Sequence, residues 1–287
     1  MPDNTNKFHL GLCMAGSISA GAYTAGVIDY LLEALESWEN VRENHSIPKH
    51  QVVIDLLCGS SGGGITGAMT MFALMDRKMD HAKLGEDGVT FMKPVTNILW
   101  DSWVELSEGD VFEQLLATDE LKKGEVRSLL NSNFIDITAD KLERYVKALT
   151  TAGMAKPAFA GNAPELFMTL FNITGIKYVL HSRAATTSSA GRQYVSDHRD
   201  IAHFRWSDTP YQNDGRITLN KDIKNLETVI HAAKATGAFP VGLKGRLVSR
   251  KAKYLWDNPF FVRVKTSIKI RLSWERVSQI PNMFIQA

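Results

Sequence analysis

The sequence lacks the features that mark exported, disulfide-rich and membrane-spanning proteins. Its 287 residues include only two cysteines, Cys13 and Cys58, too few to build a disulfide framework. No stretch reaches the roughly 18 uncharged apolar residues that a membrane-spanning helix needs, because the longest candidate, residues 21–35, contains two acidic side chains. The polar N-terminus, residues 1–7, has no signal-peptide core behind it. We therefore expect a cytoplasmic protein.

Two kinds of binding motif are also missing. The eight histidines show no ligand spacing such as H-E-x-x-H, so we expect neither a metal site nor a cofactor. The glycine-rich stretch 59–64 is followed by Ile65 and not by the Lys-[Ser/Thr] pair of a P-loop, which disfavours phosphate binding there. No internal repeat or low-complexity linker divides the chain, and we expect a single domain over 1–287.

Basic residues are concentrated at the C-terminal end of the sequence. Residues 241–287 contain ten Lys or Arg against two acidic residues, a net charge of +8, whereas the whole chain carries only +2. The first 240 residues therefore carry −6. A basic segment of this kind favours contact with an anionic surface, such as phospholipid headgroups or nucleic acid. A solvated basic face is the alternative interpretation.

Apolar runs separated by glycines predict an α/β fold. Residues 8–14 and 52–58 are short apolar runs that predict buried strands, and both cysteines fall within them, which predicts buried thiols. Each run leads through small residues into a helix, predicted over 19–38 and over 62–75. A strand, turn and helix repeated twice is typical of a parallel sheet with right-handed crossovers.

The rest of the chain predicts further helices and strands. Residues 76–164 have a helical pattern, in which Thr138 is expected to cap a helix that continues to Leu149. Two strands and a last helix are expected at 165–174, 193–204 and 225–235. Three aromatic residues at helical spacing are expected in the core, and the alternative is that some of them line an acyl channel: Trp100, Trp103 and Phe112.

The segment Gly59-Ser60-Ser61-Gly62-Gly63 matches the pattern G-x-S-x-G. The pattern alone is weak, since it occurs by chance in about one chain in ten of this length and composition. Its position is informative, because it lies between a predicted buried strand and a helix opened by glycines, as a nucleophile elbow requires. A flexible Gly/Ser loop, the alternative, would not explain the apolar segments on either side. We therefore predict that Ser61 is a catalytic nucleophile.

A second turn of small residues, Ala15 to Gly21, follows the first predicted strand. The carboxyl ends of neighbouring parallel strands share one edge of a sheet, so we expect this turn and Ser61 to face the same crevice. Backbone N–H groups in such turns can stabilise the oxyanion of an acyl-transfer reaction. The N-terminus of the helix after Ser61 adds a favourable partial positive charge.

The order of three segments along the chain resembles the patatin-like phospholipase family, particularly its bacterial patatin-related branch. These segments are the small-residue loop, the G-x-S-x-G helix and a later segment. The later segment, His231 to Pro240, is similar to the A-[ST]-x-A-x-P segment that lies under the patatin site. The stretch ending in Asn172-Ile173-Thr174-Gly175 resembles an inner strand of the family. The resemblance spans about residues 8–243 and leaves 244–287 as a basic C-terminal segment.

The resemblance implies a three-layer α/β/α fold with a mostly parallel central sheet. It also implies a Ser-Asp dyad that hydrolyses the fatty acyl esters of phospholipids or related lipids. Ser61 then corresponds to the nucleophile, and Gly16 with Ser17 to the oxyanion hole. The dyad aspartate takes the serine proton directly, which near neutral pH requires that partial burial raise its pKa. The partners expected are lipid and an anionic membrane contacted peripherally, and no nucleic acid.

The sequence departs from the family pattern in two places. The loop Met14 to Ala20 lacks the acidic residue and the arginine of D-G-G-G-x-R-G. No D-G-[GA] triplet follows Pro240, and the nearest in wording, Asp214-Gly215-Arg216, precedes it. The one aspartate that follows Pro240 in this sequence is Asp257, which is therefore the candidate base. The alternative is that the segment with the aspartate lies beyond residue 287 in a longer protein.

Two other functions remain open from the sequence. An α/β-hydrolase triad would combine Ser61 with residues among Asp197, His198, His203 and His231, but it predicts more sheet before the nucleophile than one strand. A patatin-like fold without catalysis, which binds lipid or a partner protein, is favoured by the missing D-G-[GA] triplet.

Overall fold

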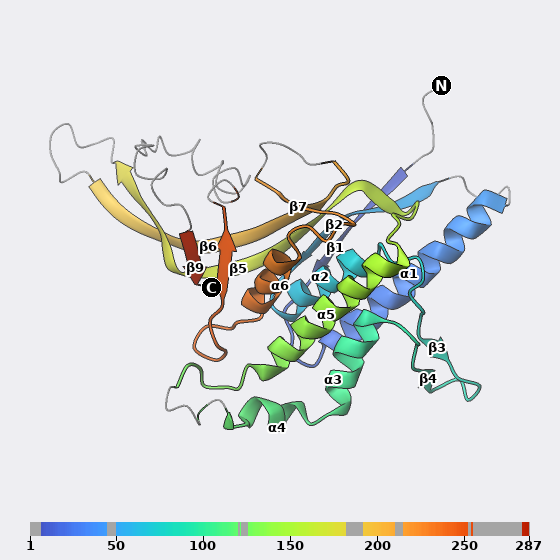
Figure 1. Cartoon of the computed structure of the whole chain (residues 1–287), viewed down its shortest axis with the longest axis horizontal. Helices are drawn as coiled ribbons and strands as arrows, with labels where there is room; N and C mark the ends of the chain where they lie inside the picture. The colour runs from blue at the N-terminus through green and yellow to red at the C-terminus, as the bar shows by residue number, and fades with distance from the viewer. Residues whose placement is uncertain are drawn as a thin grey trace.

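The computed structural model describes residues 7–44, 50–119, 121, 126–181, 192–209, 215–251, 254 and 283–286. It has the α/β architecture that the apolar runs predict, with a long twisted sheet above a group of helices (Figure 1). Asp257, the candidate base, lies outside the described residues, as does most of the basic segment 244–287.

Five strands form the central sheet in the order β1-β2-β5-β6-β7. Their bounds are Lys7–Met14 (β1), Gln51–Gly59 (β2), Ala160–His181 (β5), Arg192–Trp206 (β6) and Ile217–Leu219 (β7). Neighbouring strands are parallel except for β5 and β6, which pair antiparallel. The predicted mostly parallel sheet is confirmed, as are the strands expected at 8–14 and 52–58.

One buried helix, α2 (Gly62–Ala73), joins the sheet to the other helices. All of its residues are buried, and it contacts β1, β2 and β5. Small residues let it approach the sheet closely, since a Cβ atom at Gly67 would lie only 3.0 Å from Cδ1 of Leu166. The helices predicted from the sequence pack around α2 and one another: α1 (Gly21–Asn44), α5 (Asn133–Ala152) and α6 (Leu226–Thr236).

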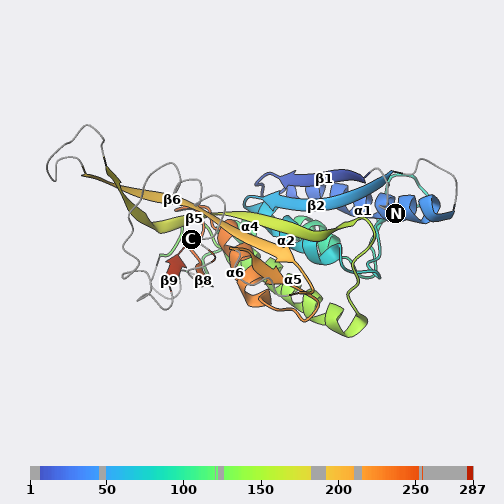
Figure 2. The same ribbon diagram turned by 90° about the horizontal axis from the view of Figure 1, so that it is seen from above.

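The helices of the described ranges gather on one face of the sheet, and Figure 2 shows α2, α5 and α6 on the same side. Side chains along β5 alternate between the two faces. Leu166, Met168 and Leu170 are buried toward the helices, whereas Phe167 and Phe171 point to the opposite face, where Phe171 is 47% exposed. Of the two helical layers expected, the described residues supply one.

The middle of the chain is less helical than its pattern predicts. A small antiparallel hairpin, β3 (Lys83–Leu84) and β4 (Phe91–Met92), interrupts it. At the hairpin turn the Asp87 side chain accepts hydrogen bonds from two backbone N–H groups, and Gly88 adopts φ 66°. An Asp-Gly pair is a strong hairpin signal, and here it outweighs the helical periodicity.

Further helices follow this hairpin: the π-helix η1 (Trp100–Val104), α3 (Glu105–Glu108), α4 (Val111–Leu116) and α5. Thr138 does not cap a helix as predicted, because α5 already begins at Asn133, and the Thr138 hydroxyl donates to the carbonyl of Phe134 inside it. Trp103 is buried as expected. Phe112 is 74% exposed, because the short helix α4 buries only one residue, Leu115.

The prediction that both cysteines are buried is wrong. Cys13 is exposed and Cys58 is half-buried, and the two lie opposite each other in the register of β1 and β2. The buried positions of these strands face the helices and are taken by neighbouring residues, such as Leu57 in β2. Because side chains alternate along a strand, the thiols point to the other face.

A separate antiparallel pair, β8 (Leu247–Arg250) and β9 (Met283–Gln286), packs against α6 and β5. Arg250 connects it to β6 through a fully buried ion pair with Asp200. Within the described ranges, no helix is both long enough and apolar enough to cross a bilayer.

Candidate active site

Ser61 occupies the turn between Gly59, the last residue of β2, and Gly62, the first residue of α2. Its backbone has φ 53° and ψ −126°, a conformation that non-glycine residues seldom adopt and that costs about 1–3 kcal/mol. The turn is tight, because a Cβ atom at Gly59 would lie 2.3 Å from the carbonyl carbon of Gly63. Close packing therefore requires these glycines of the G-x-S-x-G match.

The small-residue loop after β1 packs directly on this turn. A Cβ atom at Gly16 would lie 3.0 Å from Cβ of Ser61 and 3.7 Å from its Oγ, so a side chain at position 16 would crowd the hydroxyl. A Cβ atom at Gly62 would lie 2.3 Å from the carbonyl oxygen of Ser17. The two turns thus meet at one edge of the sheet, as neighbouring parallel strands require.

Three backbone N–H groups at this junction have no hydrogen-bond acceptor among the described residues: those of Gly16, Ser17 and Gly62. The Gly62 group belongs to the first turn of α2, where unpaired N–H groups carry a partial positive charge. Donors in this arrangement can stabilise a negative charge that develops beside Ser61.

Thr236, the last residue of α6, holds the turn from another side. Its Oγ1 accepts a hydrogen bond from the N–H of Ser61 over 3.0 Å, and a Cβ atom at Gly64 would lie 2.7 Å from its Cγ2 methyl. Thr236 is 9% exposed. Sequence reasoning missed this role, although the resemblance of 231–240 to A-[ST]-x-A-x-P marked the neighbourhood.

The Ser61 hydroxyl has no carboxylate partner within the part of the chain that the structure describes. Asp257 lies outside that part, so the Ser-Asp dyad stays a prediction. Three residues of the alternative triad are engaged elsewhere: Asp197 with Arg199, His198 with the Asn172 carbonyl and His203 with Glu165. The fourth, His231, lines a separate polar pocket that Lys234 also lines.

Glu165 on β5 is a half-buried carboxylate with a structural role. It pairs with His203, Arg205 and Arg216. Burial opposes the ionisation of Glu165, but hydrogen bonds from His203 and Arg216, together with their charges, outweigh this effect and lower its pKa to about 2. A general base needs a pKa near the working pH. Glu165 is therefore unsuited to that task and instead links β5 to β6 and to the residue before β7.

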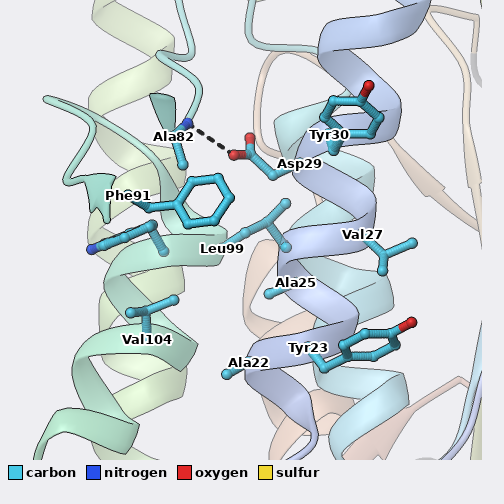
Figure 3. Close-up of a pocket in the computed structure, with 12 residues that line it drawn as sticks. Ala22, Tyr23, Ala25, Val27, Asp29, Tyr30, Ala82, Phe91, Leu99 and Val104 are labelled. Atoms are coloured by element: carbon cyan, nitrogen blue, oxygen red, sulfur yellow. Dashed lines mark hydrogen bonds between the residues drawn. The ribbon is translucent and has the colours of Figure 1, made fainter. Parts of the chain in front are cut away.

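An apolar pocket of about 600 Å³ opens beside the first turns of α1 (Figure 3). One wall is α1, and the other is formed by the β3–β4 hairpin and η1. Its apolar lining includes Ala22, Ala25, Val27, Phe91, Leu99 and Val104. Trp100, one of the aromatic residues considered for an acyl channel, also lines it. Because residues 15–20 lead directly into α1, the pocket begins where the loop beside Ser61 ends.

Among the described residues that line this pocket, Asp29 carries the one carboxylate, and both of its oxygens hold hydrogen bonds. Its Oδ1 lies 2.7 Å from Nδ1 of His81 and accepts from Nδ2 of Asn97 over 2.8 Å, and its Oδ2 accepts from the N–H of Ala82 over 3.0 Å. Burial opposes the protonation of His81, but the hydrogen bond and charge of Asp29 outweigh it and raise the pKa of His81. These contacts fasten the hairpin to α1.

Comparison with known proteins identifies a family for most of the chain. The family model of patatin-like phospholipases matches residues 12–258. The uncharacterized protein y4iI of Sinorhizobium fredii (strain NBRC 101917 / NGR234) is 30% identical over an alignment of 278 residues, and the match covers 84% of this chain and 37% of the relative. The chain thus spans little more than a third of that relative's length. No solved structure matches the chain significantly.

Proposed function

The chain belongs to the patatin-like phospholipase family, and from this premise we propose that it hydrolyses fatty acyl esters of phospholipids or related lipids with Ser61 as the nucleophile. The observation that carries the proposal is the strained backbone of Ser61 beside N–H groups without acceptors in the described ranges. A partly exposed hydroxyl on a strained strand-to-helix turn favours a catalytic role.

In the proposed reaction, Oγ of Ser61 attacks the ester carbonyl carbon, and its proton passes to a carboxylate base. The carbonyl oxygen becomes an oxyanion, which the N–H groups of Gly16, Ser17 and Gly62 stabilise. Loss of one such donor typically costs about 10²–10³ in rate. The tetrahedral intermediate then collapses, the alcohol part of the lipid leaves with the proton, and water hydrolyses the acyl-enzyme to release the fatty acid.

Asp257 is the proposed base, because it is the aspartate that follows the 231–240 segment in this chain. The alternative base is an aspartate beyond residue 287. The variant Asp257→Asn separates the two, with Ser61→Ala as the reference for complete loss. A folded Asp257→Asn protein as inactive as Ser61→Ala supports Asp257, whereas unchanged activity points to another carboxylate.

The proposed function is tested by measuring fatty acid released from phosphatidylcholine micelles. Wild-type protein is compared with Ser61→Ala and with the matched control Ser60→Ala, which removes the neighbouring, exposed hydroxyl. We expect release by wild type and Ser60→Ala and a loss of at least 10³-fold in Ser61→Ala. Equal release by Ser61→Ala would rule out the proposed nucleophile.

A lipid-binding protein without catalysis is the second candidate. It is favoured by the absence of a D-G-[GA] triplet after Pro240 and of a carboxylate on Ser61 in the described ranges. Both candidates include peripheral contact of the basic residues 241–287 with an anionic membrane, which salt should weaken. Folded wild-type protein that floats with anionic liposomes but releases no fatty acid would favour binding alone.

A further inference from the structure

We propose that the apolar pocket between α1, η1 and the β3–β4 hairpin is the groove that holds the distal part of the fatty acyl chain. The inference rests on the proposed function and deepens it, because it assigns long-chain acyl lipids as the substrates of Ser61. Its support comes from the position of the pocket, from the chemistry of its lining and from one glycine that leaves it open.

The pocket lining follows directly in the sequence on the loop that packs on Ser61. Ser17 contacts Gly62 at the nucleophile turn, and four residues later Gly21 is packed so tightly that a Cβ atom there would lie 2.3 Å from the ring of Trp103. The pocket begins at the next residue, Ala22. An acyl chain that leads away from Ser61 across this loop would therefore reach the pocket at its Ala22 end.

The lining fits a hydrocarbon chain and offers little to a polar ligand. The walls are aliphatic and aromatic, and the oxygens of Asp29 already hold hydrogen bonds from the hairpin side (Figure 3). Tyr23 and Tyr30 are 78% and 72% exposed at the rim, where an aromatic ring with a polar tip suits a border between lipid and water. The volume of about 600 Å³ is in the range of ordinary ligand pockets.

Gly26 leaves the middle of the groove open. It lies on the exposed side of α1 and lines the pocket, and a Cβ atom built on it meets nothing within 4 Å. A larger side chain at this position would therefore extend into the groove without disturbing the core. Leucine also has a higher helix propensity than glycine, so the variant Gly26→Leu is expected to fold.

The test compares Gly26→Leu with wild type on p-nitrophenyl esters of four and sixteen carbons. Each methylene pushed out of apolar contact weakens binding roughly three- to fourfold. Displacing two or three methylenes should therefore lower the ratio of C16 to C4 hydrolysis at least tenfold. The control Ala34→Leu adds the same side chain at an exposed position of α1 outside the groove, and it should leave the ratio unchanged. An unchanged ratio in Gly26→Leu would overturn the proposal.

Binding of the fluorescent 18-carbon fatty acid cis-parinaric acid gives a readout that does not need catalysis. In the Ser61→Ala background we expect parinarate binding that Gly26→Leu weakens at least tenfold and Ala34→Leu does not. If this pattern holds but no ester is hydrolysed by wild type, the groove stands and the proposed function fails. If esters are hydrolysed and Gly26→Leu alters neither selectivity nor parinarate affinity, the groove fails and the proposed function stands.

Discussion

Replacing Thr236 separates the two contacts by which α6 supports the nucleophile turn. Thr236→Val keeps the Cγ2 methyl that packs near Gly64 but removes the Oγ1 that accepts from the N–H of Ser61 over 3.0 Å. An N–H left without a partner costs about 1–3 kcal/mol. The Ser61 backbone also loses the hydrogen bond that helps to keep it at its positive φ. We expect a loss of stability of that size, and a fall of at least tenfold in nucleophile reactivity, since small displacements of a reacting group cost about 10²-fold.

The matched variant Thr236→Ser should lose some stability but keep the reactivity of Ser61. It keeps the acceptor and loses only the methyl, so we expect a stability loss of about 1 kcal/mol with near-normal reactivity. Urea unfolding measures the stability, and the second-order rate of fluorophosphonate labelling measures the reactivity. The reasoning is refuted if Thr236→Val labels as fast as wild type, or if both variants slow labelling equally.

Two further predictions concern titratable groups away from Ser61. The pKa of Glu165 is lowered to about 2 from 4.5, so its contribution to stability is complete above about pH 4.5 and is lost as the pH falls toward 2. Urea unfolding between pH 2 and 5.5 should show a smaller pH dependence in Glu165→Gln, and an equal slope would contradict this. Burial, a hydrogen bond to Cys13 and the charge of Cys13 raise the pKa of Cys58 to about 11. Because the thiolate reacts and Cys13 is the more exposed of the two thiols, a maleimide at pH 8 should modify Cys58 more slowly than Cys13 in the wild-type protein, as read by peptide mapping, and equal rates would contradict this.

The sequence was sufficient to predict the elements that surround Ser61. The strands β1 and β2 are mostly apolar runs, each ended by small residues, and α2 is opened by glycines, so composition and spacing indicate both the elements and their order. The Asp87-Gly88 pair was also a readable signal, but the helical periodicity around it obscured the hairpin.

Features that depend on contacts distant in the sequence could not be predicted in the same way. Thr236 meets Ser61 across 175 positions, and periodicity carries no information about such a contact. The exposure of Cys13 and Cys58 depends on which face of the sheet the helices cover, and an apolar run without alternation does not specify this. The apolar pocket likewise arises because Asp29 fastens the hairpin to α1.

Ser61 is tested as the nucleophile most directly by fluorophosphonate labelling of the purified protein, read by intact mass and by mapping of the labelled peptide. We expect one adduct per chain, located on Ser61, present in Ser60→Ala and absent in Ser61→Ala. A folded wild-type protein that forms no adduct, or an adduct that persists in Ser61→Ala, would contradict this expectation.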